Sequence, residues 1–185
     1  MRFRATFVSV LWSVSFAAMA GLPVAESLSI QYPVDFEVAL NKEGFEPKDW
    51  PGFVPRGESA ENWTLKLGSR TDPSGAKSDP EQYFNKFALE VSEQCDGAEV
   101  FAVKSKEKAG SRAAFVGFIY CNREKSGSAG EVAAYRMISG DDAMFIVKMA
   151  KRVAPFTSST KPSDINLQYM ETLVRRSSVC RGKKC

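Results

Sequence analysis

The chain has no histidine, so the side chain that most often exchanges protons at neutral pH is missing from all 185 residues. Two segments match S-x-x-K, the spacing that lets a lysine activate a serine nucleophile: residues 105–108 and 158–161. Both segments are polar, and the S-D-N and K-T-G elements that accompany S-x-x-K in penicillin-binding enzymes are absent. We therefore expect no catalytic residue.

Adjacent carboxylates at Asp141 and Asp142 are of the type that binds calcium or magnesium. They follow Gly140 in a short connection between two expected strands, where glycine and aspartate are ordinary turn residues. Two ligands are too few for a cation site, so we expect no metal. The phosphate-binding and dinucleotide-binding glycine patterns are absent as well, and we expect no cofactor.

The candidate binding site is a loop rich in proline and aromatic residues, together with the strand that follows it. Its residues are Trp50, Phe53, Arg56 and Trp63. Three prolines between residues 47 and 55 exclude regular structure there and lower the entropy lost when the aromatic rings dock on a partner. Exposed aromatic rings dominate binding hot spots. The alternative is that these rings are buried and cover one end of the sheet.

The first twenty residues read as a secretory signal peptide. Arg2 and Arg4 precede an uncharged, mostly apolar stretch, and residues 18–20 (Ala-Met-Ala) give the pattern that signal peptidase cleaves. The apolar stretch is shorter than the roughly 18 to 20 residues of a membrane anchor. We expect a single soluble domain, residues 21–185, that is periplasmic or secreted and is not inserted in the membrane.

Export makes the four cysteines interpretable, because thiols pair in oxidising compartments. Residues 99–104 and 112–121 read as two strands around a polar turn, and a hairpin centred near Lys108 would pair residues whose numbers sum to about 216. This register predicts a disulfide between Cys95 and Cys121. Cys180 and Cys185 are then left to close a small loop near the end of the chain.

The expected fold is α+β, with an antiparallel sheet of about six strands covered by two helices in the order β-β-α-β-β-β-β-α. Asp79 caps the first helix and Gly97 stops it, and the second helix runs from Ser163 to about Ser177. Apolar residues on both faces of strand 112–121 predict a central strand. The expected strands cover residues 35–41, 62–69, 99–104, 112–121, 131–138 and 143–152.

The charge balance excludes general affinity for nucleic acid. The formal net charge of +3 includes Arg2 and Arg4, so cleavage leaves a nearly neutral domain. From Lys148 to the end the chain holds nine basic and two acidic residues. This basic end is either a contact surface or, at Arg175 and Arg176, a set of cations that offsets the dipole of the last helix.

One resemblance adds to this interpretation. Residues 54–64, Val-Pro-Arg-Gly-Glu-Ser-Ala-Glu-Asn-Trp-Thr, resemble the P-x-G-E-S-x-x-N-W-T stretch of small periplasmic proteins of proteobacteria. The element order is similar to that of Mog1/PsbP-like domains. That resemblance implies a binding or assembly role and transfers no catalytic residue.

Together these observations predict an exported, non-catalytic binding or assembly factor that acts on an unknown protein or envelope component. Two alternatives stay open: a secreted effector or inhibitor, and a histidine-free hydrolase that uses serine and lysine or paired carboxylates.

Overall fold

The computed structural model describes residues 25–41, 50–103 and 107–182. Its elements, in chain order, are β1 (Glu26–Ile30), β2 (Phe36–Val38), β3 (Gly52–Pro55), β4 (Leu65–Asp72), the short 3-10 helix η1 (Pro73–Gly75), α1 (Pro80–Ser92), β5 (Ala98–Ala102), β6 (Glu107–Ala109), β7 (Arg112–Cys121), β8 (Gly130–Ser139), β9 (Met144–Val153), α2 (Leu167–Arg175) and β10 (Ser177–Arg181). The expected signal peptide lies outside the described residues. Neither described helix combines the length and apolarity needed to cross a membrane.

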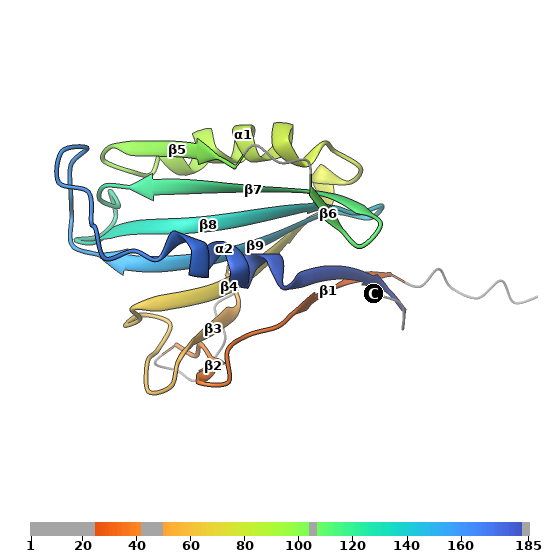
Figure 1. Cartoon of the computed structure of the whole chain (residues 1–185), viewed down its shortest axis with the longest axis horizontal. Helices are drawn as coiled ribbons and strands as arrows, with labels where there is room; N and C mark the ends of the chain where they lie inside the picture. Colours follow the sequence, from red (N-terminus) through yellow and green to blue (C-terminus); the bar gives the residue numbers. More distant parts are fainter. Residues whose placement is uncertain (1–24, 42–49, 104–106, 183–185) are drawn as a thin grey trace, which may run out of the picture.

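Eight strands form one antiparallel sheet in the order β2-β3-β4-β9-β8-β7-β5, with β6 also paired to β7 (Figure 1). A separate antiparallel ribbon joins β1 to β10. The expected antiparallel α+β class with two helices is confirmed, whereas the expected six strands and their order are wrong. The long strands β7, β8 and β9 lie side by side, and β4 joins the sheet on the far side of β9.

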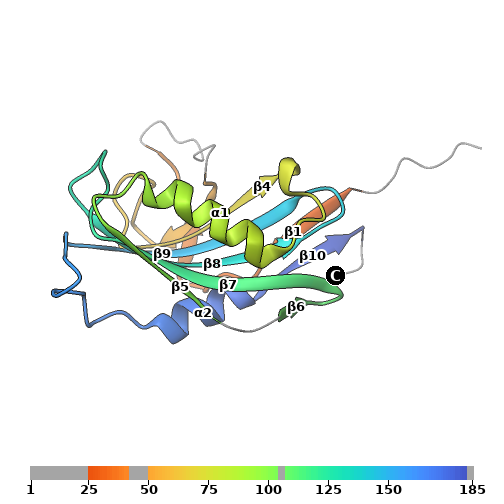
Figure 2. The same ribbon diagram turned by 90° about the horizontal axis from the view of Figure 1, so that it is seen from above.

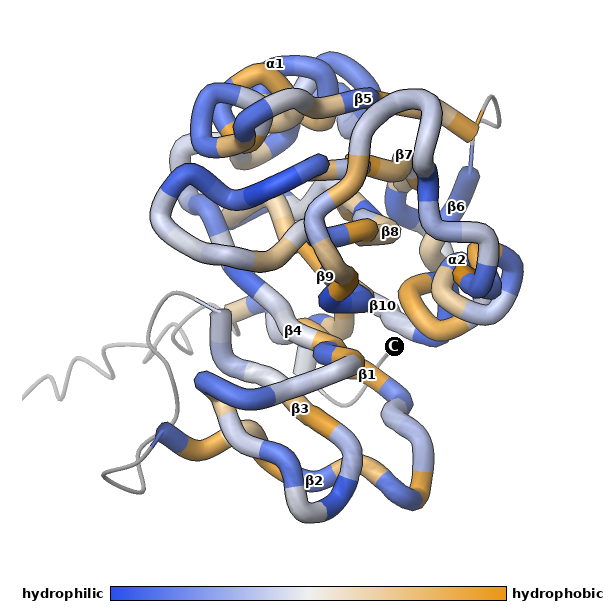
Figure 3. The backbone as a smooth tube through the Cα atoms, turned by 90° about the vertical axis from the view of Figure 1, so that its left-hand side faces the viewer, coloured by the Kyte–Doolittle hydropathy of each residue, from blue (hydrophilic) through white to orange (hydrophobic). Residues whose placement is uncertain are grey.

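The middle strands are apolar on both faces, and this pattern requires a layer on each side. On one face, here called the α1 face, residues such as Phe115, Ile119 and Met137 pack against α1. On the opposite face, the α2 face, residues such as Val116 and Phe118 pack against α2. Figures 2 and 3 show the two helices on opposite sides of the sheet. The prediction of two apolar faces for strand 112–121 is confirmed, although β7 lies next to the edge strand β5 rather than at the centre of the sheet.

Helix α1 begins as expected, because the Asp79 carboxylate accepts hydrogen bonds from the backbone N–H groups of Glu81 and Gln82. The helix buries Phe84 against β7, where Gly117 has no side chain. A β-carbon on Gly117 would come within 2.3 Å of the Phe84 ring. This close approach sets the distance between helix and sheet.

Three expectations about secondary structure are wrong. Residues 52–55 form β3 despite the flanking prolines, because Pro55 ends the strand near the edge of the sheet, where a missing N–H is tolerated. The second helix begins at Leu167, since the Asn166 side chain, not Ser163, accepts the capping hydrogen bond from Tyr169 N–H. The chain after Arg175 continues as β10, which pairs with β1.

The Sγ atoms of Cys95 and Cys121 are 2.08 Å apart, and their Cα atoms are 5.4 Å apart. This is the pair that the sequence analysis expects, but the register behind it is wrong. Ala98 lies opposite Cys121 in the sheet, and Cys95 precedes β5 in the turn that follows α1. The expected bond from Cys180 to Cys185 stays a prediction, because residue 185 lies outside the described part of the chain.

We predict that Gly117→Ala destabilises the protein by about 1 to 3 kcal/mol, because the new methyl group collides with the Phe84 ring. Gly68→Ala is the matched control: Gly68 also lies in a strand on the α1 face, but its β-carbon would meet the nearest atoms at an ordinary 3.4 Å. Thermal melts of both variants check this, and equal losses would contradict the packing of α1 described here.

Candidate functional site

The four residues expected to form one binding site are divided between the two faces of the sheet. Trp50 and Trp63 pack in the core on the α1 face, whereas Phe53 packs against the α2 face. Trp50 precedes β3, whereas Phe53 lies within β3 with its side chain on the α2 face. The four residues therefore form no single contiguous surface.

Trp63 is not an exposed anchor. Its side chain is buried, and the Arg152 guanidinium lies 4.3 Å from the centre of a Trp63 ring. Trp50 is half-buried and lies over Gly68 of β4, with its ring edge-on to Phe87 and Tyr135. For Trp63, the structure supports the alternative of burial over the expected binding role.

Phe53 and Arg56 do lie near one another, at the β2–β3 end of the sheet. The Phe53 ring stacks on the Tyr32 ring with 4.0 Å between centroids, and Val38 is the cross-strand neighbour of Phe53. Arg56 is exposed, and its backbone N–H donates to the Asp35 carbonyl in the preceding turn. We call Tyr32, Val34, Val38 and Phe53 the Tyr32–Phe53 patch.

The patch leaves much apolar surface in contact with solvent: the exposed fractions are 49% for Tyr32, 95% for Val34 and 45% for Val38. The sequence analysis did not include Tyr32 and Val34. The available signal was the triplet Tyr32-Pro33-Val34, which places two large apolar side chains beside a proline in a segment with no other assignment.

A second site, which the sequence analysis missed, is a cavity of about 260 Å³ beside the C-terminal half of α1. Phe87 and Glu90 of α1 line one wall, Trp50 and Arg70 line another, and the disulfide Cys95–Cys121 closes one end. Helix α1 packs mainly on β7, β8 and β5, and the cavity lies on the side of the helix that faces β4 and β9.

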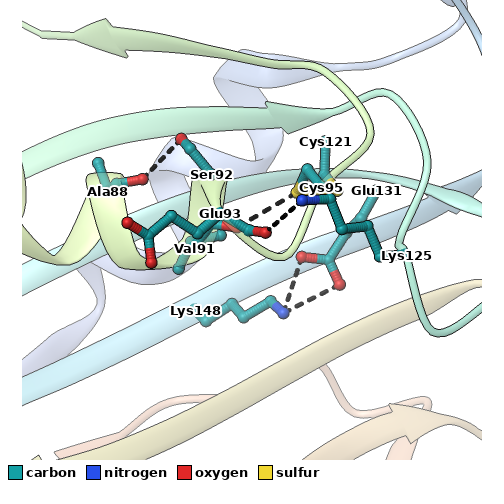
Figure 4. The surroundings of a disulfide bond; sticks show 9 residues. All are labelled: Ala88, Val91, Ser92, Glu93, Cys95, Cys121, Lys125, Glu131 and Lys148. Atoms are coloured by element: carbon teal, nitrogen blue, oxygen red, sulfur yellow. Dashed lines mark hydrogen bonds and ion pairs between the residues drawn. A yellow bond between two sulfur atoms is a disulfide. The ribbon is translucent and has the colours of Figure 1, made fainter.

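An ion pair lies in this cavity, close to the disulfide (Figure 4). The Lys148 ammonium is 2.7 Å and 2.9 Å from the two carboxylate oxygens of Glu131, and the side chains are only 17% and 10% exposed. The ammonium also lies 5.4 Å from the centre of a Trp50 ring and 5.9 Å from that of Tyr135. This arrangement combines an ion pair with cation–π contacts.

The electrostatics of this cavity do not favour proton transfer near neutral pH. Burial lowers the pKa of Lys148, but the Glu131 carboxylate outweighs this effect, so the net shift of the Lys148 pKa is upward. Burial also raises the pKa of the Tyr135 phenol. A lysine that acts as a general base needs a lowered pKa, which is the opposite of what Lys148 has.

The sequence did contain a signal for this ion pair. Lys148 interrupts the apolar alternation of Met144, Ile146 and Ala150 on the α1 face of β9. Glu131 interrupts the same face of β8. A charged residue of each sign on apolar faces of adjacent strands predicts a buried pair.

Lys161, considered above as part of a catalytic S-x-x-K segment, and Asp141, considered as a metal ligand, both form ion pairs. Lys161 donates to Glu99 at 2.5 Å, and the Lys161 ammonium and the Ser158 hydroxyl hold the pKa of the Glu99 carboxyl below its usual range. The other S-x-x-K serine, residue 105, lies outside the described residues.

The Asp141 carboxylate is 2.7 Å from the Arg112 guanidinium and 3.1 Å from that of Arg181. Arg112 and Arg181 thus occupy the side of Asp141 that a cation would use. In the described part of the chain, no group of three or more cysteine, aspartate or glutamate side chains could hold a metal ion.

Comparison with known proteins identifies relatives by fold only. No family model and no curated sequence matches the chain. LpqN of Mycobacterium tuberculosis, described as involved in cell envelope biogenesis, is similar with a TM-score of 0.50 and 12% identity, over 86% of this chain and 87% of LpqN. The Saccharomyces cerevisiae Ran-binding protein Mog1p is similar with a TM-score of 0.51 and 15% identity, over 83% of this chain and 93% of Mog1p.

These likenesses confirm the Mog1-like topology that the element order suggested. At such low identity they show the fold alone. The resemblance of residues 54–64 to a stretch of proteobacterial periplasmic proteins stays a prediction.

We predict that Lys148→Met destabilises the protein by about 3 to 5 kcal/mol, because it leaves the Glu131 carboxylate buried without its cation. The matched control on the same strand is Lys151→Met. Lys151 pairs with Asp164, whose side chain is 73% exposed, so this change should cost about 1 kcal/mol or less.

The double variant Lys148→Met, Glu131→Leu should recover most of the lost stability, because it removes both buried charges. Chemical denaturation of the three variants measures these differences. Equal stability of the Lys148 and Lys151 variants would contradict a buried ion pair.

Proposed function

We propose that the protein is an exported, non-catalytic binding factor that engages a protein partner of the cell envelope through the Tyr32–Phe53 patch. The observation that carries this proposal is the exposed apolar surface of the patch, in which Tyr32, Val34 and Val38 are each about half exposed or more. The signal peptide expected at residues 1–20 supports a partner outside the cytoplasm.

The geometry of the patch suits a binding surface. The stacked rings of Tyr32 and Phe53 hold each other in place, and Pro33 restricts the backbone beside them. Little side-chain entropy is then lost when a partner covers the rings. The exposed Arg56 next to the patch supplies a polar rim.

The absence of catalysis in this proposal is supported by the state of the titratable groups. In the cavity, Lys148 is paired with Glu131 and has a raised pKa, and the pKa of Tyr135 is raised as well. Lys161 is paired with Glu99, and this contact holds the pKa of the Glu99 carboxyl below its usual range. None of these groups is prepared to accept a proton from a nucleophile near neutral pH.

The described roles of two proteins with a similar fold are compatible with the proposed role. LpqN is described as involved in cell envelope biogenesis, and Mog1p is described as a Ran-binding protein. Neither protein supplies a partner for this chain, since the likeness is one of fold.

We predict that Phe53→Ala and Tyr32→Ala weaken capture of the envelope partner by more than about 1 kcal/mol each, as at a binding hot spot. Phe101→Ala is the matched control, because Phe101 is an aromatic residue of similar exposure (44%) on the edge strand β5, away from the patch. Cross-linking in intact cells, followed by affinity measurement with the purified partner, makes the comparison.

The proposal fails if the patch variants and the Phe101 variant retain the same affinity. It also fails if the wild-type protein turns over a substrate from a hydrolase panel and one substitution abolishes that activity. Fractionation of cells into medium, periplasm and cytoplasm separates a resident envelope factor from a secreted effector or inhibitor.

A further inference from the structure

Two neighbouring hollows run along α1 on its β4 side. The first is the cavity of about 260 Å³ that contains Lys148 and Glu131, and the second, of about 450 Å³, extends toward Asp72 and Tyr83. Arg70, Phe87 and Glu90 line both hollows, so these three residues stand where the two meet.

Charged side chains of both signs line this junction. Arg70 comes from β4 and Glu90 from α1, and neither side chain forms an ion pair with any described residue. Glu124, from the loop after β7, adds a second carboxylate to the first hollow and likewise has no ion pair in the described part of the chain.

The neighbouring polar groups are already engaged. Asp72, two residues after Arg70 on the same face of β4, accepts hydrogen bonds from the Tyr83 hydroxyl and from Ser74. Glu131 accepts from Lys148 at two oxygens. Hydrogen bonds from Tyr83 and Ser74 lower the pKa of the Asp72 carboxyl, and the Arg70 charge adds to this effect. Since neither Arg70 nor Glu90 forms an ion pair with a described residue, both can still contact a ligand.

One part of the first hollow is apolar: Trp50, Phe87 and Val91 line it together with the disulfide. The remainder is lined by polar side chains, including Gln94, Ser126 and the Lys148–Glu131 ion pair. The volume of the first hollow, about 260 Å³, lies just below the roughly 300 to 1,000 Å³ of cavities for drug-sized ligands, so it fits a molecule about the size of an amino acid.

We propose that the junction binds the zwitterionic head of an amino acid with an apolar side chain. The Arg70 guanidinium pairs with the ligand carboxylate, which its planar fork matches in shape. Glu90 pairs with the ligand ammonium, assisted by Glu124. The apolar side chain enters the hollow between Trp50, Phe87 and Val91.

The mixed charge decides between ligand classes. A purely anionic ligand would face the carboxylates of Glu90 and Glu124, and a purely cationic ligand would face Arg70. Either arrangement leaves like charges together, which costs affinity and so rejects that ligand. A zwitterion places one charge against each wall. This site is separate from the Tyr32–Phe53 patch, so it can be tested independently of the proposed function.

The test is calorimetric titration of the purified protein with three matched compounds: L-leucine, N-acetyl-L-leucine and L-leucinamide. Acetylation removes the ammonium charge, and amidation removes the carboxylate charge. We expect leucine to bind and each derivative to bind at least about tenfold more weakly, which corresponds to a loss of one ligand charge contact.

Two variants assign the contacts. In Arg70→Gln, amidation of the ligand should no longer change the affinity, and in Glu90→Gln, acetylation should no longer change it. The controls are Arg176→Gln and Glu81→Gln, which change exposed residues of the same types outside both hollows. Both controls should keep the wild-type preference for leucine.

Binding of the three compounds with equal affinity would overturn the proposal, as would the absence of binding by leucine at about 10 mM. A leucine preference that survives in both the Arg70 and the Glu90 variants would also overturn it. Circular dichroism melts confirm that the variants are folded, which is expected because both side chains are exposed. Loss of leucine binding would leave partner capture by the Tyr32–Phe53 patch unchanged.

Discussion

The burial of the middle strands from both sides is the constraint on which the rest of the structure depends. Strands β7, β8 and β9 are apolar on both faces, so neither face is stable in water without a covering layer. Helix α1 covers one face and α2 covers the other. Gly117 lets the Phe84 ring approach the sheet closely, and the disulfide from Cys95 to Cys121 ties the turn after α1 to the end of β7.

Both candidate sites lie where this double covering ends. Helix α1 packs mainly on β7 and β8 and meets β4 at the Tyr83–Asp72 hydrogen bond, so a hollow remains along its β4 side with Lys148 and Glu131 in it. The β2–β3 end lies beyond both helices (Figure 3). There the Tyr32 ring stacks on Phe53 and is itself half exposed to solvent. The fold thus supplies a rigid centre and leaves binding surfaces at its margin.

Local signals in the sequence predicted much of the centre. The Asp79 cap and the two-faced apolar strand 112–121 can be read from short segments. The pairing of Cys95 with Cys121 was also expected, although from a hairpin register that is wrong. The pairing of β1 with β10 joins distant parts of the chain, and no local pattern predicts it. The binding surfaces follow from the same long-range arrangement: Tyr32 meets Phe53, and Glu131 meets Lys148, only after the strands have assembled.

Native-state amide hydrogen exchange tests this division between centre and margin most directly. If both faces of β7, β8 and β9 are held by the helices, their amides should exchange only through global unfolding. The amides of β2 and β3 should exchange much faster, through local opening. Exchange of β2 and β3 at the same slow rate as β8 would contradict the account, because the β2–β3 end would then belong to the rigid centre.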